Sequence, residues 1–206
     1  MRLIVLGPPG SDRGTIADLI GEQLGVPVLR VSDVFQAAAR ANTPAAVQAM
    51  RHMNAGELVP EDVSLSMIRD RLSRPDVADG FVLDGWAQAV PLDGLLSDLG
   101  APLDRVIDLV LSDAEVLRRL TGRRLCRACG KLWHVEFAAP TRPDTCDNCG
   151  GELSQREDDS PERVTAGMGS YRPFVAPALD HFRPLGKLIS IDATLPQAEI
   201  VAVSIA

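Results

Sequence analysis

The sequence predicts an α/β protein in which a parallel sheet is flanked by helices. Apolar runs of strand length alternate along the chain with segments whose apolar residues recur at helical spacing. The first run, Met1–Leu6, leads directly into a glycine-rich loop, Gly7–Thr15, and then into a helical segment, which is the repeating unit of such sheets. At 206 residues the chain can bury a substantial core, and its length suits one domain that carries insertions.

Each expected strand is a short apolar run, and each expected helix follows a start signal. The strands are Met1–Leu6, Val26–Val31, Phe81–Asp84, Arg105–Leu111 and Lys187–Asp192. The helices are Thr15–Leu24, Asp33–Ala41, Ala45–Ala55, a segment from Pro60 through Leu72, Asp113–Thr121 and a C-terminal segment from about Pro196.

Capping residues set several of these boundaries. Ser32 is expected as the N-cap of the second helix, and Thr43 as the N-cap of the third, with Pro44 in its first turn. Gly25 and Gly56 are expected to end the first and third helices.

A further helix starts at Ser160–Glu162 and contains three residues that disfavour helix. Glycine in a helix interior costs about 1 kcal/mol relative to alanine, and proline about 3 kcal/mol. Gly167, Gly169 and Pro173 therefore predict a bend or break near 167–173.

The loop Gly7–Thr15 is a candidate phosphate-binding loop. Such a loop turns backbone N–H groups toward a phosphate, the following helix adds partial positive charge, and Thr15 offers a hydroxyl to magnesium. The usual pattern, G-x-x-x-x-G-K-[ST], is not kept, because Asp12 replaces a glycine and Arg13 replaces the lysine. Asp12 adds negative charge and strains the loop if its φ is positive. Arg13 keeps the charge on a bulkier group.

All four cysteines lie in one segment as two Cys-x2-Cys pairs. Cys126 and Cys129 form the first pair, and Cys146 and Cys149 form the second. This spacing is typical of a zinc site, and four thiolates would make the ion structural because they close its coordination shell. Two disulfides are the alternative, but cytosolic chains rarely form them.

With these features the chain resembles the adenylate kinase family of P-loop nucleoside monophosphate kinases, whose loop usually reads G-x-P-G-x-G-K-G-T. The resemblance covers nearly the whole chain. The other segments that carry it are Ser32–Asp33, Gly56–Val59, Gly80–Gly85, Gly122–Arg124, Arg156–Asp159 and Pro177.

The resemblance implies three parts and two cofactors. The P-loop core is expected at 1–29, 60–121 and 160–206, an acceptor-binding insertion at 30–59, and a zinc-binding lid at 122–159. ATP with Mg²⁺ is the implied phosphoryl donor, and Zn²⁺ is the implied structural ion of the lid.

On the donor side, the resemblance implies that the cations are kept. Arg119 matches the arginine that lies against the adenine of ATP, and Arg123 and Arg156 match lid arginines that close on its phosphates. Asp84 matches the carboxylate that helps to hold magnesium, although an aspartate that caps the next turn is the alternative. The implied catalytic residues are Arg13, Arg123, Arg156 and Asp84, and the implied nucleotide-binding residues are Gly7, Gly10, Asp12, Arg13, Gly14, Thr15, Arg119 and Arg123.

On the acceptor side, the same resemblance implies that the cations are lost. Family arginines fall at Gln36, Gln88 and Gly167, the glutamine that recognises the AMP base falls at Leu92, and a threonine falls at Val31. A single arginine at a transferring phosphoryl group can supply about 1000- to 100000-fold in rate, so AMP phosphorylation is predicted to be weak or lost. The implied acceptor pocket comprises Ser32, Asp33, Gln36, Glu57, Val59, Gly85, Gln88 and Leu92.

The sequence leaves three functions open. The family reaction is ATP:AMP phosphotransfer. A second possibility keeps ATP as the donor and uses a less charged acceptor, and a third is a catalytically silent relative that binds a nucleotide or a protein.

Bulk composition limits the partners. The chain carries 21 basic and 28 acidic residues, a net charge of -7, which argues against a broad nucleic-acid surface. Apolar runs fall short of the roughly 18 residues of a membrane span, and no secretion signal is recognisable. We expect a cytoplasmic monomer without nucleic-acid or membrane partners. The histidines His52, His134 and His181 are scattered and are expected at the surface or in the lid.

Overall fold

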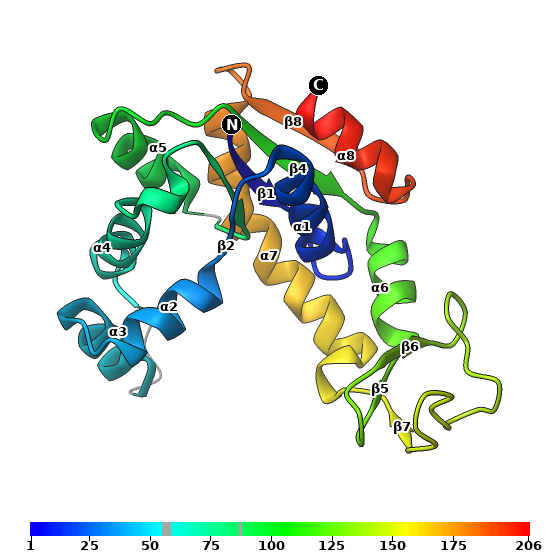
Figure 1. Ribbon diagram of the computed structural model, residues 1–206. Coiled ribbons are helices and arrows are strands. Elements are labelled where there is room, and N and C mark those ends of the chain that lie inside the picture. Colours follow the sequence, from blue (N-terminus) through cyan, green and yellow to red (C-terminus); the bar gives the residue numbers. More distant parts are fainter. Residues whose placement is uncertain (55–58, 87) are drawn as a thin grey trace. The chain divides into compact units, whose positions relative to one another are not determined.

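The computed structural model describes residues 1–54, 59–86 and 88–206 of the chain (Figure 1). The expected helix end at Ala55 and the stop at Gly56 lie outside these residues.

The chain forms two compact units. Unit 1 comprises Met1–Gly7, Asp12–Leu109 and Phe174–Ala206, and unit 2 comprises Pro8–Ser11 and Val110–Pro173. The finer division into core, insertion and lid stays a prediction.

Unit 1 is built on a five-stranded sheet in the order β2-β3-β1-β4-β8. β1 pairs in parallel with β3 and β4, and β3 pairs in parallel with β2, which confirms the predicted sheet. Val5 lies opposite Asp84 in this register, so the carboxyl ends of β1 and β3 meet at one edge, where α/β folds bind ligands. The strands are β1 (Arg2–Leu6), β2 (Val28–Arg30), β3 (Phe81–Asp84), β4 (Arg105–Val110) and β8 (Leu188–Asp192).

The helices of unit 1 cover this sheet and extend from it. α1 contacts β1, β2 and β3 and packs against α8, while α2, α3 and α4 pack against one another (Figure 1). The apolar face of α1 is buried at Ile16, Ala17 and Ile20. The helices are α1 (Arg13–Leu24), α2 (Val31–Arg40), α3 (Pro44–Asn54), α4 (Glu61–Leu72), α5 (Ala89–Asp98) and α8 (Gln197–Ile205), with a short 3₁₀ turn, η1, at Pro75–Val77.

One of the two predicted N-caps is confirmed. The Thr43 hydroxyl accepts a hydrogen bond from the backbone N–H of Ala46 at 3.2 Å, as a capping residue should. The prediction for Ser32 is wrong, because β2 ends at Arg30 and α2 begins directly at Val31. Ser32 therefore lies within the first turn, where its hydroxyl donates to Asp33 at 3.5 Å.

Sequence reasoning missed α5. Pro91 and Gly94 within this segment indicate a loop by propensity. Pro91, however, falls in the first turn of α5, where backbone N–H groups have no partner within the helix, so the N–H that proline lacks costs no hydrogen bond. Burial of Leu92, Leu95 and Leu96 then stabilises the helix.

Unit 2 combines two helices with a small antiparallel sheet. α6 (Asp113–Thr121) was predicted with the same bounds. It shares an apolar cluster with the start of α7, formed by Val116, Leu120, Val164 and Met168. The small sheet has the order β6-β5-β7 and was not predicted. Its strands are β5 (Arg123–Cys126), β6 (Leu132–His134) and β7 (Leu153–Ser154), followed by a 3₁₀ turn, η2, at Glu157–Asp159.

A break near 167–173 is contradicted, because α7 is one α-helix over Pro161–Phe182, and the bend that was its alternative stays a prediction. Apolar side chains on this helix are buried, and each such side chain contributes about 1.5–3 kcal/mol, which together exceeds the propensity penalty. The buried residues are Val164, Met168, Val175, Ala178 and Phe182.

Within the described ranges, no helix is both long and apolar enough to cross a bilayer.

Asp108 is a titratable group in the sheet itself. It lies on β4 opposite Leu6, and the Ser190 hydroxyl donates to its Oδ2 at 3.4 Å. Burial raises the pKa of this carboxyl above its ordinary value, although Ser190 and Arg183 act in the opposite direction. The folded state thus binds the proton more tightly than the unfolded chain does, and the ionised form is destabilising at neutral pH.

We predict that Asp108→Asn raises the thermal unfolding midpoint by a few degrees at neutral pH, because the amide removes a half-buried charge and keeps an acceptor for Ser190. The gain should shrink as pH falls toward the ordinary aspartate pKa of about 4, because Asp108, with its raised pKa, takes up its proton in the folded state before the unfolded chain does. Differential scanning calorimetry at both pH values measures it. Asp98→Asn, at an exposed site on α5, is the control, and a lower midpoint for Asp108→Asn at neutral pH would contradict the argument.

Candidate functional site

The carboxyl edge of the sheet in unit 1 brings Arg13 and Asp84 together. Arg13 is the first residue of α1, and its Nε donates to Asp84 Oδ1 while its NH1 donates to the carbonyl of Gly7 at 3.2 Å. The Asp84 side chain is only 8% exposed, so the arginine supplies the counter-charge that a buried carboxylate requires. The replacement for the P-loop lysine is therefore bound to the carboxylate that was predicted to help hold magnesium.

A second arginine, Arg30, also approaches Asp84 and was missed from the sequence. Its Nε lies 3.8 Å from Asp84 Oδ2, and its NH2 donates to both carboxylate oxygens of Asp18 on α1. Arg30 ends β2, next to β3 in the sheet, so a charged residue at a strand's carboxyl end was the available signal.

The glycine loop has the strain that its sequence predicted. Asp12 adopts φ 57° and ψ 26°, in the left-handed region, and Gly10 has φ 83°. Aspartate tolerates this region better than most residues, but a glycine would adopt it without steric cost. Gly14 follows in α1, where an added Cβ would lie 3.5 Å from Asp84 Oδ2, and Thr15 is exposed on the same turn.

In unit 2, Arg119 lies against the loop segment Pro8–Ser11. Its NH1 donates to the carbonyl of Gly10 at 3.0 Å, and its Nε donates to Glu115 at 2.8 Å. The hydrogen bond from Arg119 lowers the pKa of Glu115, assisted by Arg118. The predicted adenine-contacting arginine is thus anchored beside the glycine loop.

Arg123 is held by an acid that sequence reasoning did not single out. Its Nε and NH2 donate to the two oxygens of Asp159 at 2.9 and 2.5 Å, and Asp159 is 1% exposed. Arg156 is more open, with a side chain that is 49% exposed and lies 3.7 Å from Asp158.

A cavity of about 480 Å³ adjoins these residues within unit 2. Gly10, Arg123, Asp159 and Gly167 are among the residues that line it. A Cβ added at Gly167 would meet open space among the described residues, so a larger side chain would fit at this position.

The implied acceptor residues lie in two parts of unit 1. Gln36 is exposed on α2 and accepts a hydrogen bond from Arg40 at 3.3 Å, and Gln88 precedes α5, where its carbonyl accepts from the Trp86 indole at 2.9 Å. Leu92 is fully buried, in the core beneath α5. Glu57 lies outside the described residues, and the role of the whole set stays a prediction.

The remaining implied acceptor residues differ in exposure. Ser32 and Asp33 are exposed on the first turn of α2, whereas Val59 and Val31 are half-buried. Gly85 has φ 84°, and a Cβ there would lie 2.7 Å from Arg13 NH2, so only glycine allows the arginine to lie across β3 at this point.

The four cysteines converge in unit 2, as predicted. Their Sγ atoms all lie within 4.8 Å of one another, with Cys126 and Cys149 3.5 Å apart and Cys129 and Cys146 3.7 Å apart. Zinc bonds of about 2.3 Å to four thiolates would place the sulfurs about 3.8 Å apart, so the residues fit a structural zinc ion. All four are free rather than joined as disulfides.

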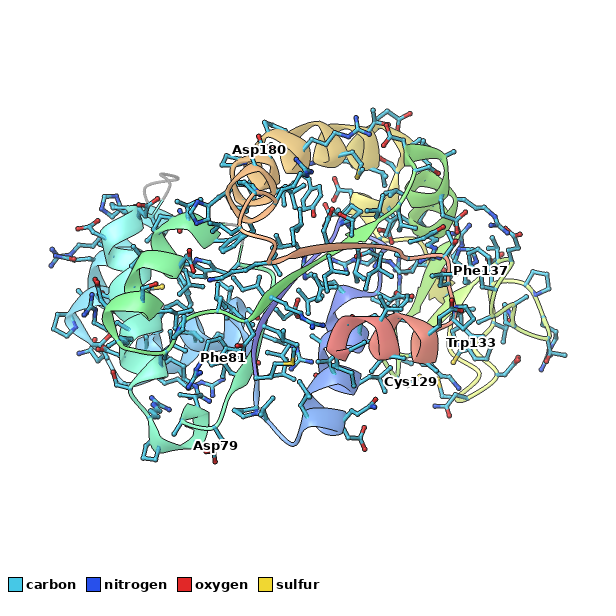
Figure 2. All side chains as sticks on the ribbon, turned by 90° about the horizontal axis from the view of Figure 1, so that it is seen from above. Asp79, Phe81, Cys129, Trp133, Phe137 and Asp180 are labelled. Atoms are coloured by element: carbon cyan, nitrogen blue, oxygen red, sulfur yellow. The ribbon has the colours of Figure 1, made fainter. Side chains whose placement is uncertain are left out.

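The local backbone explains why the cysteines converge. Gly130 and Gly150 follow the two pairs with φ of 72° and 73°, and their N–H groups return to the carbonyls of Cys126 and Cys146 at 3.0 and 2.8 Å. Two equal turns thus present the two thiol pairs to one point. Trp133 packs against Cys126 and Cys146 of this cluster. Figure 2 labels Trp133 together with Cys129.

The thiols differ in acidity, because hydrogen bonds within the cluster stabilise the thiolate of Cys129 and raise the pKa of Cys149 to about 12. The backbone N–H of Lys131 and the Cys149 thiol lower the pKa of Cys129 to about 6.

Comparison with known proteins finds relatives of nearly the same length. A family model for adenylate kinase matches residues 5–187. An adenylate kinase of Salinispora tropica is 48% identical over 204 residues, which cover 97% of this chain and 94% of that protein. One of Acidothermus cellulolyticus is 45% identical over 210 residues, covering 100% and 97%, and one of Archaeoglobus fulgidus is 40% identical over 198 residues, covering 94% and 91%.

For the cysteine cluster, we predict about one zinc ion per chain in protein purified under reducing conditions, and its loss in Cys129→Ser. The exposed side chain of Cys129 makes little packing contribution, so the variant tests ligation rather than core filling. Metal analysis by mass spectrometry measures the content, and Thr145→Ser in the same segment is the control. Chelation should increase amide hydrogen exchange in 122–159 before unit 1. Two disulfides and no metal would overturn the assignment.

Proposed function

Because the chain belongs to the adenylate kinase family, we propose that it binds ATP through its glycine loop and lid arginines and phosphorylates AMP weakly or not at all. Adenylate kinases transfer a phosphoryl group from ATP to AMP and use Mg²⁺ with ATP. The proposal separates the two halves of that reaction, because the donor residues are present and the acceptor arginines are not.

Retained donor residues support ATP binding. Phosphoryl transfer needs positioning and charge neutralisation more than covalent chemistry from the protein. Backbone N–H groups of the loop and the guanidinium groups of Arg119, Arg123 and Arg156 supply both. Arg123 uses one edge of its guanidinium on Asp159, and its other N–H donors remain for a phosphate.

The proposal of weak AMP turnover is based on the residues of the expected acceptor pocket. Gln36 and Gln88 offer amides, and Gly167 offers no side chain, at three positions where family members have arginine. Arg30 lies in the same unit, but its charge is offset by Asp18 and Asp84. A dianionic AMP phosphate would leave water for a site with little uncompensated positive charge.

One structural feature favours a less charged acceptor as the second candidate. A cavity of about 120 Å³ lies between α2, α3 and α4 beside Gln36, and its other lining residues are apolar. Phe35, Met50 and Met67 are among them. Such a surface suits an uncharged group better than a phosphate.

We predict measurable ATP binding that depends on the lid. Arg156→Ala should weaken ATP binding about tenfold, the effect of removing one charge-assisted hydrogen bond, with little effect on folding because the side chain is half exposed. Isothermal titration calorimetry measures the affinity. The matched control is Arg127→Ala, a lid arginine that donates to Ser154 instead. If the unmodified chain gave no heat and no thermal shift with millimolar ATP, the donor site would be closed and only the silent function would remain.

We predict AMP turnover orders of magnitude below the typical kinase rate of about 1 to 100 per second. Gln36→Arg combined with Gln88→Arg should restore measurable AMP binding, because it returns two positive charges. Full activity should also need Gly167→Arg, Asp12→Gly and Arg13→Lys.

The control for the double variant is Gln23→Arg combined with Gln197→Arg, which adds the same two charges at exposed positions on α1 and α8. A coupled assay of ADP formation, with host kinase excluded, measures turnover. Ordinary AMP-to-ADP turnover by the unmodified chain would refute the proposal, while transfer to an uncharged acceptor in the same assay would select the second candidate.

A further inference from the structure

Two guanidinium groups share the Asp84 carboxylate. Arg13 Nε donates to one oxygen, and Arg30 Nε lies 3.8 Å from the other. Arg30 is itself paired with Asp18, so two positive and two negative side chains balance at the end of β3. Asp84 therefore has its charge neutralised by the protein alone.

Three contacts hold Arg13 in this position. Besides the bond to Asp84, its NH1 donates to the Gly7 carbonyl at 3.2 Å. The planar guanidinium reaches these two acceptors with two different nitrogen atoms, whereas a lysine has only one nitrogen. Its NH2 lies against Gly85, where a Cβ would come within 2.7 Å. Releasing Arg13 would break both hydrogen bonds and leave a nearly buried carboxylate with Arg30 at 3.8 Å as its remaining partner.

This arrangement does not fit a magnesium ion held through Asp84. A divalent cation beside Asp84 would meet the guanidinium groups of Arg13 and Arg30 at close range. A +2 ion about 4 Å from one unit positive charge is repelled by about 8 kcal/mol at an effective dielectric constant of 20. Magnesium also demands near-octahedral oxygen ligands, whereas the Asp84 oxygens already accept from, or face, nitrogen donors.

We infer that Arg13 replaces the metal as the partner of Asp84, so that this chain does not distinguish ATP from Mg-ATP. Magnesium then arrives and leaves as part of the nucleotide and gains no ligand from Asp84. The inference rests on the proposed ATP binding, and it assigns Arg13 as the residue that sets metal dependence.

Calorimetric titration of the full chain with ATP tests this, once in excess magnesium and once in EDTA. The dissociation constants for ATP and Mg-ATP should agree within about threefold. Both titrations are run at high ionic strength, which screens the difference in charge between the two forms of the nucleotide. Arg13→Lys should raise the preference for Mg-ATP to about tenfold or more, because a single ammonium leaves room on Asp84 for the metal. Arg69→Lys, at an exposed position on α4, is the matched control and should behave like the unmodified chain. A preference of more than about tenfold in the unmodified chain would overturn the inference.

A second measurement needs no ATP binding and separates this inference from the proposed function. The Arg13 Nε–H signal in nitrogen-15 NMR, assigned by its loss in Arg13→Lys, should show slow exchange and should change in Asp84→Asn. Titration with magnesium alone should leave it in place. Loss of the slow-exchanging signal on adding magnesium would show that the metal displaces Arg13 and would sink the inference, even in a chain that failed to bind ATP.

Discussion

A carboxylate that is almost buried at the end of a parallel strand needs a cation, and in unit 1 this constraint fixes the geometry around Asp84. β3 delivers Asp84 to the carboxyl edge, β1 delivers the glycine loop, and α1 returns Arg13 to the carboxylate. Gly85 lies against the guanidinium, where a Cβ would displace it, and its φ of 84° is one that glycine adopts without strain. The first turn of α1, the loop and the strand are thereby tied together by one ion pair, and unpairing a buried charge typically costs about 3–5 kcal/mol.

The cysteine-bearing segment of unit 2 is stabilised in a different way. Its apolar cluster consists of Cys126, Cys146 and Leu153, with Trp133 packed against them, which is too little to stabilise a fold by burial alone. Two turns with matching glycine conformations bring the thiols together, so a metal would supply the missing free energy. Arg118 adds a contact with Glu136 and lies 4.5 Å from the Phe137 ring centre, which links the lid to α6 within unit 2.

Local patterns in the sequence predicted the features that depend on neighbouring residues, and they failed where the interacting partners are distant in the chain. Strands, the Thr43 cap and the cysteine pairs depend on neighbouring residues, so their patterns were sufficient. The unbroken α7 was unpredictable from propensity because apolar burial along the helix outweighs the cost of its glycines and proline. Arg30 was missed because its partner Asp84 is far away in the sequence, and only the strand order brings them together.

The arginines predicted to meet phosphates are already paired with acids, and this determines how an anion can bind. Arg123 is bidentate on buried Asp159, and Arg13 is bound to nearly buried Asp84. If a phosphate replaced either acid as the partner of its arginine, a buried carboxylate would be left without a counter-charge. A ligand therefore binds most favourably to the guanidinium N–H groups that the acids do not use. A guanidinium has five donors and can serve an acid and a phosphate together, whereas an ammonium bound to an acid presents a single point charge. Arg13 thus remains bound to Asp84 when a nucleotide is present, and the backbone N–H groups of the loop contact the phosphates.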